Sequence, residues 1–432
     1  MRLKVMVFVL AALASGIARA DLRIVITEGV ARAVPVAVVP FGWSGGGEKP
    51  IDIADVVAAD LERSGRFAPM SQEDMLERPT SSTDIDFEDW RLLGTDVIVI
   101  GRLIPESAER YTIQFQLFDV FRGKQLLGYR LPSTHTALRA SAHKISDMIF
   151  EKLTGIPGTF STRIAYVSVE GERQDRTYKL IVADADGENA ATIAESSASI
   201  LSPAWSPDGR QLAYVSFEGD ASSIFLQTLR TGERQQISAH AGVNGAPAFS
   251  PDGRHLAMTL SDADGNLDIW IMDLASGELR RVTDSDAIDT EPAWTADGDT
   301  IVFTSDRSGG PQVYRVRARG GRPERLTFEG NYNARPRVSP TKENELAVVH
   351  NDRGNYRIAL VNTARNTLQI LTEGRLDESP SFAPNGNTII YATQNGRQGV
   401  LATVSVDGLV QQRIVSEDGE VREPAWSPFP TS

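Results

Sequence analysis

Short apolar runs separated by polar turns fill the larger, C-terminal part of the chain. A Pro-x-apolar element opens one such run at regular intervals, and these elements begin at Pro203, Pro247, Pro292, Pro336, Pro380 and Pro424. The steps between them are 44, 45, 44, 44 and 44 residues. A repeat of roughly 40–50 residues with several short strands per unit is typical of β-propeller blades.

The first repeat shows how one unit is built. Residues 203–205 and 211–215 are β-type runs, and the segment Ser206-Pro207-Asp208-Gly209 between them has the residues of a tight turn. We therefore expect the two runs to pair as a hairpin. Two further β-type runs, at 223–228 and 234–237, complete a unit of four strands.

The ends of the repeat region indicate how the propeller closes. The sixth repeat stops after its first strand, which carries Trp426. Three runs at the other end of the region have no first strand of their own, and they lie at 163–168, 178–183 and 191–193. The pattern predicts six blades, with the C-terminal strand completing the first blade and burying Trp426. Closure of this kind protects sheet edges that would otherwise pair with other chains.

The N-terminus has the features of a secretory signal peptide. Arg2 and Lys4 precede a short apolar run, and Ala18-Arg19-Ala20 fits a small-x-small cleavage site. We therefore predict that residues 1–20 are removed on export. No later apolar run is long enough to span a bilayer, so the protein is not expected to be embedded in a membrane.

Residues 34–158 mix helix-like and strand-like patterns. The apolar positions fit helices and strands at 52–64, 137–153, 34–41, 96–103, 111–120 and 125–131. They predict a small α/β domain that ends at Gly155-Ile156-Pro157-Gly158, a helix stop and domain boundary. The expected fold is therefore two-domain, with an α/β domain at 34–158 and a six-bladed β-propeller at 159–432.

An extended arm, residues 21–33, precedes the α/β domain. Within it, Leu22, Ile24 and Ile26 alternate with Arg23, Val25 and Thr27, and all of these residues except Arg23 favour strands or tolerate them well. A strand at a chain end can add itself to the sheet of a partner. It can equally pair with the sheet of its own N-terminal domain, and the sequence leaves both arrangements open.

The charge and the cysteine content exclude some classes of function. The formal net charge is −13, and removal of Arg2, Lys4 and Arg19 with the signal peptide takes it to −16. Binding of nucleic acid is therefore not expected. The chain has no cysteine, which excludes disulfides and the acylated cysteine of a lipoprotein.

One motif raises the possibility of an enzyme. Gly42-Trp43-Ser44-Gly45-Gly46 matches the G-x-S-x-G nucleophile elbow, which makes a propeller-containing serine hydrolase or peptidase the alternative function. No helix follows Ser44 directly, however, and the domain is small for a hydrolase. The only histidines in it are His135 and His143, both near its final helix. We therefore interpret the motif as a flexible loop and expect no catalytic residue.

Acidic residues suggest two further kinds of site. Asp184-Ala185-Asp186-Gly187 and Asp262-Ala263-Asp264-Gly265 resemble calcium loops but lack the remaining ligands, so we interpret them as turns and expect no metal or cofactor. Glu291 and Glu423 directly precede repeat prolines, and Glu378 lies two residues before another. We expect these three carboxylates to converge on one mouth of the channel, either as solvated loop charge or as a negative funnel for a basic partner or a cation.

The whole chain resembles the TolB family, the periplasmic component of the Tol-Pal system of Gram-negative bacteria. The resemblance covers the signal peptide, the arm, the α/β domain, the joint at 151–158, and the repeats at 202–209 and 245–253. It implies a monomeric periplasmic adaptor that supports outer-membrane integrity and constriction during cell division. Its expected partners are the outer-membrane lipoprotein Pal at the propeller and TolA at the arm, with colicins as further ligands of the propeller surface.

The resemblance also implies binding residues. Those for Pal are Val243, Asn244, Gly245, Ala246, Thr290 and Glu291, in loops that precede inner strands. Those for TolA are Asp21, Leu22, Arg23, Ile24, Val25, Ile26 and Thr27. In the family a histidine is expected directly before Asn-Gly-Ala, whereas this chain has Val243. The resemblance therefore does not extend to a hydrogen bond through that position.

Overall fold

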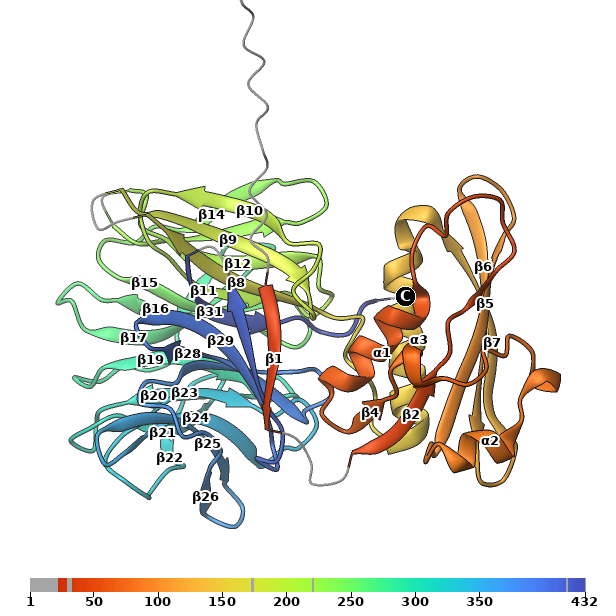
Figure 1. Ribbon diagram of the computed structural model, residues 1–432. Helices are drawn as coiled ribbons and strands as arrows, with labels where there is room; N and C mark the ends of the chain where they lie inside the picture. The colour runs from red at the N-terminus through yellow and green to blue at the C-terminus, as the bar shows by residue number, and fades with distance from the viewer. Residues whose placement is uncertain (1–21, 29–32, 172–174, 220, 417–418, 432) are drawn as a thin grey trace, which may run out of the picture.

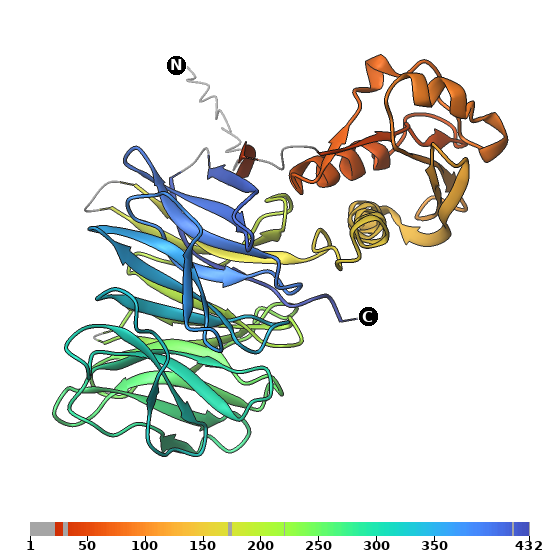
Figure 2. The same cartoon turned by 90° about the horizontal axis from the view of Figure 1, so that it is seen from below.

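The structure is a computed structural model that describes residues 22–28, 33–171, 175–219, 221–416 and 419–431. The predicted signal peptide and Asp21 lie outside the described residues. Two bodies stand next to each other in Figures 1 and 2, an α/β domain and a β-propeller. The predicted two-domain fold class is thus confirmed.

The α/β domain is built on one mixed sheet. Its strand order is β4-β2-β5-β6-β7, and β3 pairs with β5. The strands are β2 (Val34–Val38), β3 (Gly42–Trp43), β4 (Phe67–Pro69), β5 (Val97–Pro105), β6 (Arg110–Asp119) and β7 (Lys124–Thr134). The helices are α1 (Ile53–Arg63), α2 (Phe87–Leu92) and α3 (Leu138–Thr154), with single 3-10 turns η1 (Gln72–Asp74), η2 (Ser82–Asp84) and η3 (His135–Ala137).

Local sequence signals explain where the two long helices begin and end. The side chain of Asp52 accepts a hydrogen bond from the backbone of Ala54 at 3.0 Å and so caps the start of α1. Gly155 has φ +75°, a conformation that glycine adopts without strain, and it ends α3. Both helices pack on one face of the sheet, where side chains such as Leu61 and Ile149 are fully buried. Trp90 of α2 is buried against the other face.

The propeller has six sheets of four strands before the arm is counted. The first blade contains β31 (Glu420–Trp426), β8 (Arg163–Glu170), β9 (Thr177–Asp184) and β10 (Ala191–Ser196). The second and third contain β11 (Ile200–Trp205), β12 (Gln211–Ser216), β13 (Ser223–Thr228), β14 (Arg234–Ser238), β15 (Asn244–Phe249), β16 (His255–Ser261), β17 (Leu267–Asp273) and β18 (Leu279–Arg281). The other three contain β19 (Asp289–Trp294), β20 (Thr300–Ser305), β21 (Gln312–Arg317), β22 (Glu324–Arg325), β23 (Asn333–Val338), β24 (Glu345–Asp352), β25 (Asn355–Asn362), β26 (Thr367–Ile370), β27 (Glu378–Phe382), β28 (Thr388–Asn395), β29 (Gln398–Ser405) and β30 (Gln411–Ser416).

The ring closes as the sequence predicts. The C-terminal strand β31 pairs antiparallel with β8, with Ala425 opposite Ala165 and Trp426 opposite Ile164. One detail of the prediction is wrong, because Trp426 is only partly buried. Its ring packs against the cluster around Ile164, and its Nε1 donates a hydrogen bond to Thr162 Oγ1 at 2.8 Å. This indole therefore holds the C-terminal strand to the first residues of the propeller.

The arm contains a strand that joins the propeller. Strand β1 (Leu22–Glu28) pairs antiparallel with β30 and becomes the fifth strand of the sixth blade. The backbone of Leu22 lies opposite Ser416, and that of Ile24 lies opposite Ile414. Of the two arrangements that the sequence leaves open, pairing with the sheet of the N-terminal domain is not the one observed, because β1 joins the propeller. Without the arm, the outer strand β30 would have unpaired backbone groups along one edge. Strand β1 pairs with these groups and so covers the edge.

Hydrogen bonds fix the joint between the domains. The Asp147 carboxylate in α3 accepts from the backbone nitrogens of Phe160 at 2.7 Å and Ser161 at 3.2 Å. Asn385 Nδ2 in the propeller donates to the carbonyl oxygen of Pro157 at 2.9 Å. Among the helices that the structure describes, none has the length and apolar character needed to cross a membrane.

Candidate functional site

The N-terminal domain contacts one end of the propeller. Its partners there are Asp186, Asn385 and Asp407, in the turns after β9, β27 and β29. The loops that lead into the innermost strands lie at the opposite end, on the left in Figure 1. We call this end the distal face and define it by five residues in its loops: Phe217, Val243, Ile288, Phe328 and Leu376.

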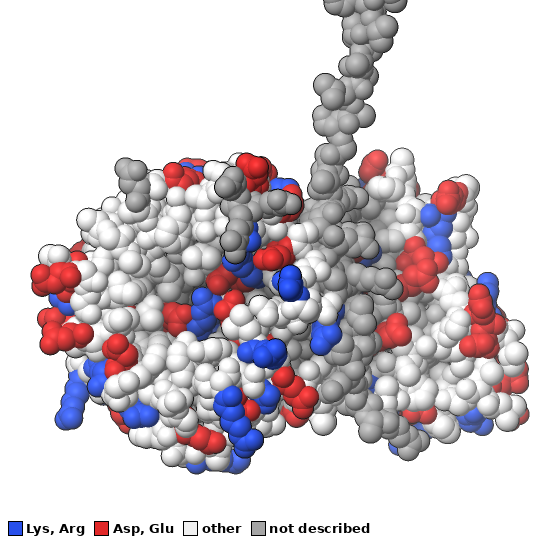
Figure 3. All heavy atoms as spheres, turned by 60° about the vertical axis from the view of Figure 1, so that its left-hand side comes forward, with Lys and Arg blue, Asp and Glu red and all other residues white. Residues whose placement is uncertain are grey.

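The distal face carries exposed apolar side chains on five blades. The exposed fractions are 43% for Phe217, 44% for Val243, 46% for Ile288, 59% for Phe328 and 36% for Leu376. Figure 3 shows the propeller obliquely from this side, with uncharged atoms over much of the surface and charged side chains of both signs gathered near its middle. Apolar side chains around a recessed charged centre are suited to docking another protein.

The charged residues at the centre occupy a position that is repeated in every blade and has an unusual backbone conformation. In every blade the residue directly before the repeat proline has a positive φ between 47° and 56°, and these residues are Ser202, Ala246, Glu291, Arg335, Ser379 and Glu423. The register of each inner strand shifts at this point, as in a β-bulge. We call these six residues the ring position. Positive φ is unfavourable for residues other than glycine, so the surrounding structure must hold it in place.

Arg335 binds the two ring-position carboxylates together. Its Nε donates to Glu291 Oε1 at 2.6 Å, and its Nη1 lies 3.1 Å from Glu423 Oε1. The backbone nitrogen of Arg335 also donates to Glu291 Oε2 at 2.9 Å, and that of Ser202 donates to Glu423 Oε2 at 3.2 Å. Nη1 of Arg335 further contacts the hydroxyl of Ser379. Five of the six blades are thus linked through one guanidinium and two carboxylates.

The electrostatics of Arg335 and Glu423 correct the expectation that the carboxylates at the channel mouth are either solvated loop charge or a negative funnel. Burial lowers the pKa of Arg335, but the charges of Glu423 and Glu291 outweigh burial and raise it overall. Burial raises the pKa of Glu423, yet Arg335 outweighs burial and lowers it overall. Glu423 is only 8% exposed, so it is not solvated loop charge. Arg335 is ion-paired with both Glu291 and Glu423, so these two carboxylates do not form an open negative funnel. Glu378 lies one residue before the ring position, which Ser379 occupies in its blade.

Sequence reasoning missed Arg335 although the signal was present. The residue directly before the fourth repeat proline is Arg335, in register with Glu291 and Glu423 before the third and sixth. Aligning the six repeats on their prolines would have placed a basic side chain among the acidic ones.

The structure places the six residues predicted to bind Pal in different environments. Val243 is exposed on the distal face, whereas Asn244 is fully buried and accepts hydrogen bonds from Ser238 Oγ at 2.7 Å and from the backbone of His240 at 2.9 Å. Gly245, Ala246, Thr290 and Glu291 are partly buried. Of the residues predicted to bind TolA, Leu22 to Thr27 lie in β1.

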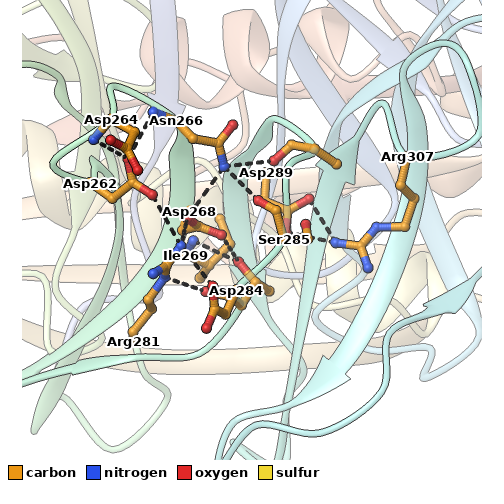
Figure 4. A network of polar contacts seen from close by, with 12 residues as sticks. Asp262, Asp264, Asn266, Asp268, Ile269, Arg281, Asp284, Ser285, Asp289 and Arg307 are labelled. Carbon is orange, nitrogen blue, oxygen red and sulfur yellow. Dashed lines mark hydrogen bonds and ion pairs between the residues drawn. The ribbon is translucent and has the colours of Figure 1, made fainter.

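The two acidic loops at 184–187 and 262–265, which we interpreted as turns, contain carboxylates that pair with arginines. Arg281 Nη2 lies 2.5 Å from Asp268, 3.3 Å from Asp262 and 3.1 Å from Asp284, as Figure 4 shows. Close by, Arg307 Nη2 contacts both carboxylate oxygens of Asp289, at 2.9 and 2.7 Å. Each of these four carboxylates therefore has a guanidinium partner in the structure. The first loop does more than turn the chain, because Asp186 contacts the N-terminal domain.

Ser44 follows the short strand β3, and both histidines of its domain are held elsewhere. His143 Nδ1 lies 2.8 Å from Asp60 Oδ2, and His135 Nδ1 lies 3.4 Å from the hydroxyl of Tyr111. Among the described residues, neither histidine has a hydrogen bond to Ser44. The loop with Ser44 is instead closed by Trp43 Nε1, which donates to the carbonyl oxygen of Gly47 at 3.1 Å.

These observations define the class of the protein as a six-bladed propeller joined to a small α/β domain, with an apolar distal face around an ionic centre. Comparison with known proteins agrees. Family profiles match as the TolB amino-terminal domain over residues 22–126 and as the TolB beta propeller domain over residues 150–430. The chain belongs to the TolB family.

Individual relatives are similar over nearly their whole length. The chain is 52% identical over 414 residues to the Tol-Pal system protein TolB of Thioalkalivibrio sulfidiphilus, and the match covers 95% of each chain. It is 52% identical over 410 residues to that of Nitrosococcus oceani, covering 95% of this chain and 94% of the relative. The crystal structure of TolB from Acinetobacter baumannii is 41% identical, with a TM-score of 0.87, and the match covers 94% of this chain and 100% of that one.

Proposed function

We propose that the protein is a periplasmic adaptor of the Tol-Pal system. In this proposal the distal face binds the outer-membrane lipoprotein Pal, the arm binds TolA, and the connection supports outer-membrane integrity and invagination during division. The observation that carries the proposal is the set of exposed apolar side chains on the distal face around the Arg335 centre. Family membership and the absence of a partner for Ser44 among the described histidines favour an adaptor over the hydrolase alternative.

The geometry divides the predicted Pal-binding residues into two groups. Val243 offers an exposed apolar surface, so we assign it to direct contact. Asn244 is fully buried and holds the loop through Ser238 and His240, so we assign it to positioning its neighbours. Thr290 is partly buried, and its hydroxyl lies 3.3 Å from that of Thr259. Colicins that use this propeller surface would then compete with Pal.

A charge placed on the distal face should weaken Pal binding without unfolding the protein. Val243→Glu puts a carboxylate where a docked apolar surface would desolvate it, and we expect the affinity for Pal to fall at least roughly tenfold. The matched control is Leu92→Glu, at an 85% exposed leucine of α2 in the N-terminal domain. Titration calorimetry with purified Pal measures both variants. Unchanged affinity in a folded Val243→Glu variant would contradict the assignment of the distal face.

Deletion of residues 21–33 should abolish TolA binding and leave Pal binding intact. Strand β1 already pairs with β30, so an arm that adds to the sheet of TolA must first leave that edge, unless TolA binds it in place. TolA is titrated into the deletion variant, and the same sample is then titrated with Pal to show that the propeller remains folded. If TolA binds the deletion variant with undiminished affinity, the arm is not its site.

A further inference from the structure

A buried ionic cluster crosses the boundary between the two domains. Asp60 lies in α1 and His143 in α3, while Asp186 comes from the propeller, in the loop between β9 and β10. The exposed fractions are 0% for Asp60, 2% for His143 and 7% for Asp186. Two arginines of the N-terminal domain, Arg63 and Arg139, complete the cluster. The propeller therefore inserts one carboxylate into a pocket of charged groups on the other domain.

His143 stands between the carboxylates of the two domains. Its Nδ1 is 2.8 Å from Asp60 Oδ2, and its Nε2 is 3.5 Å from Asp186 Oδ2. In the protonated ring both nitrogens carry hydrogen, so each faces a carboxylate with the favourable sign. In the neutral ring one nitrogen has a lone pair, and either tautomer directs that lone pair at a carboxylate oxygen. Only the imidazolium matches both neighbours.

The arginines already neutralise the two carboxylates when His143 is neutral. Arg63 contacts Asp60 and lies 3.8 Å from Asp186, and Arg139 Nη2 lies 2.5 Å from Asp186 Oδ2. Because two guanidinium groups occupy these oxygens, the cluster is not suited to a metal ion. The carboxylates of Asp60 and Asp186 nevertheless act on the imidazole more strongly than Arg63 does.

We propose that His143 is a proton-dependent latch between the two domains, which are held together when its ring is protonated and loosened when the ring is neutral. The ionisable groups that act on the ring are Asp60 and Arg63 of α1 and Asp186 of the propeller loop. On α3, Arg139 contacts Asp186, and the charge of Asp147 interacts with that of Asp60. The proposal does not depend on which partner either domain binds.

The direction of the pH dependence follows from the balance of these effects. Burial lowers the pKa of His143, but the hydrogen bond and charge of Asp60 and the charge of Asp186 outweigh burial and raise it overall. Separation of the domains would take the carboxylate of Asp186 away from Nε2, so we expect the pKa of the ring to be higher in the docked state than in the separated state. Docking is then strongest at low pH and weakens as the pH rises through the pKa of the docked state.

Loosening would reach the strand that carries the arm. Gln412 and Ile414 of β30 line a small cavity between the domains together with Arg63 and Phe160. β30 is also the strand to which β1 is added. A change in the distance between the domains would therefore alter the surroundings of β30.

The test measures the separation of the domains against pH. The chain has no cysteine, so Leu92→Cys on the α/β domain and Arg353→Cys on the propeller, at positions 85% and 95% exposed, accept a fluorophore pair without background labelling. We expect the fraction of molecules with separated domains to rise as the pH is raised from below the ordinary pKa of histidine, about 6.5, through the raised pKa of His143. Each unit of difference in the pKa of His143 between the docked and separated states corresponds to about a tenfold change in the docking equilibrium.

Three variants make the outcome decisive. His143→Gln has no titrating ring and should remove the pH dependence, and Asp186→Asn should reduce it by removing the propeller's charge. His135→Gln, in the same domain but beside Tyr111, is the matched control and should behave as the unmodified protein. Circular dichroism confirms that each variant is folded. A separation that does not change with pH in the unmodified protein, or an undiminished change in His143→Gln, would overturn the proposal.

Discussion

Truncation after Arg422 is expected to destabilise the entire propeller. The deletion removes the half of β31 that pairs with Ala165 and Ile164, so β8 loses its inner neighbour. It also removes the indole of Trp426, and Ser427, whose backbone nitrogen donates to Arg163 O at 2.8 Å. Loss of a large core side chain alone costs about 3–5 kcal/mol, and Trp426 is only partly buried, so the lower value applies to it. With the lost pairing added, we expect the melting temperature to fall by roughly 10 °C or more.

A shorter truncation provides the control for this experiment. Removal of residues 429–432 leaves β31 and Ser427 in place and deletes an exposed tail that begins with Phe429, 39% exposed. Differential scanning calorimetry should show a large fall in the melting temperature for the truncation after Arg422. For the truncation of residues 429–432, the melting temperature should lie within error of that of the full chain. If the two truncations melt alike, the C-terminal strand does not close the ring.

The period of the repeats made most of the fold predictable. Spacing alone fixed the number of blades, and the unpaired first strand at 424–426 identified the closing element. The helices at 53–63 and 138–154 followed from apolar periodicity and from the signals at Asp52 and Gly155. These features depend on local sequence, because side-chain spacing and backbone preference decide them within one element.

Contacts between elements were less predictable. The pattern of the arm shows that it is a strand but does not say which sheet edge it joins, since backbone pairing carries little side-chain information. Asp186 looked like a turn residue, because nothing in its loop indicates that His143 lies across the domain boundary. The charged centre of the distal face could not be predicted from one repeat either. Its geometry arises when six bulges, each unremarkable alone, meet around one axis.

Replacement of Arg335 by methionine is expected to be among the most damaging single substitutions in the propeller. Methionine fills a similar volume but removes the ion-pair partner that the carboxylates of Glu291 and Glu423 share. Glu423 is 8% exposed and cannot recover full hydration. Removing one partner of such a buried pair costs about 3–5 kcal/mol. Urea unfolding at neutral pH should show that the free energy of unfolding falls by this amount.

The matched control is a surface ion pair of the same chemistry. Arg315 Nη2 lies 2.8 Å from Glu324 Oε2, with the two side chains 48% and 64% exposed, so Arg315→Met should cost only a few tenths of a kcal/mol because water screens the pair. The triple variant Arg335→Met, Glu291→Gln, Glu423→Gln should recover part of the loss, since the two carboxylates that Arg335 pairs are then removed with it.

The effect of pH separates lost charge pairing from lost packing. In the unmodified protein Arg335 lowers the pKa of Glu423, so this pair stabilises the fold above the ordinary pKa of a glutamate and the contribution disappears as the pH falls. Without Arg335, burial should raise that pKa above its unfolded value. The variant should then lose stability as the pH rises from about 4.5 to about 7.5. If Arg335→Met lowers the free energy of unfolding by the same amount at both pH values, Arg335 contributes through packing and not through its charge.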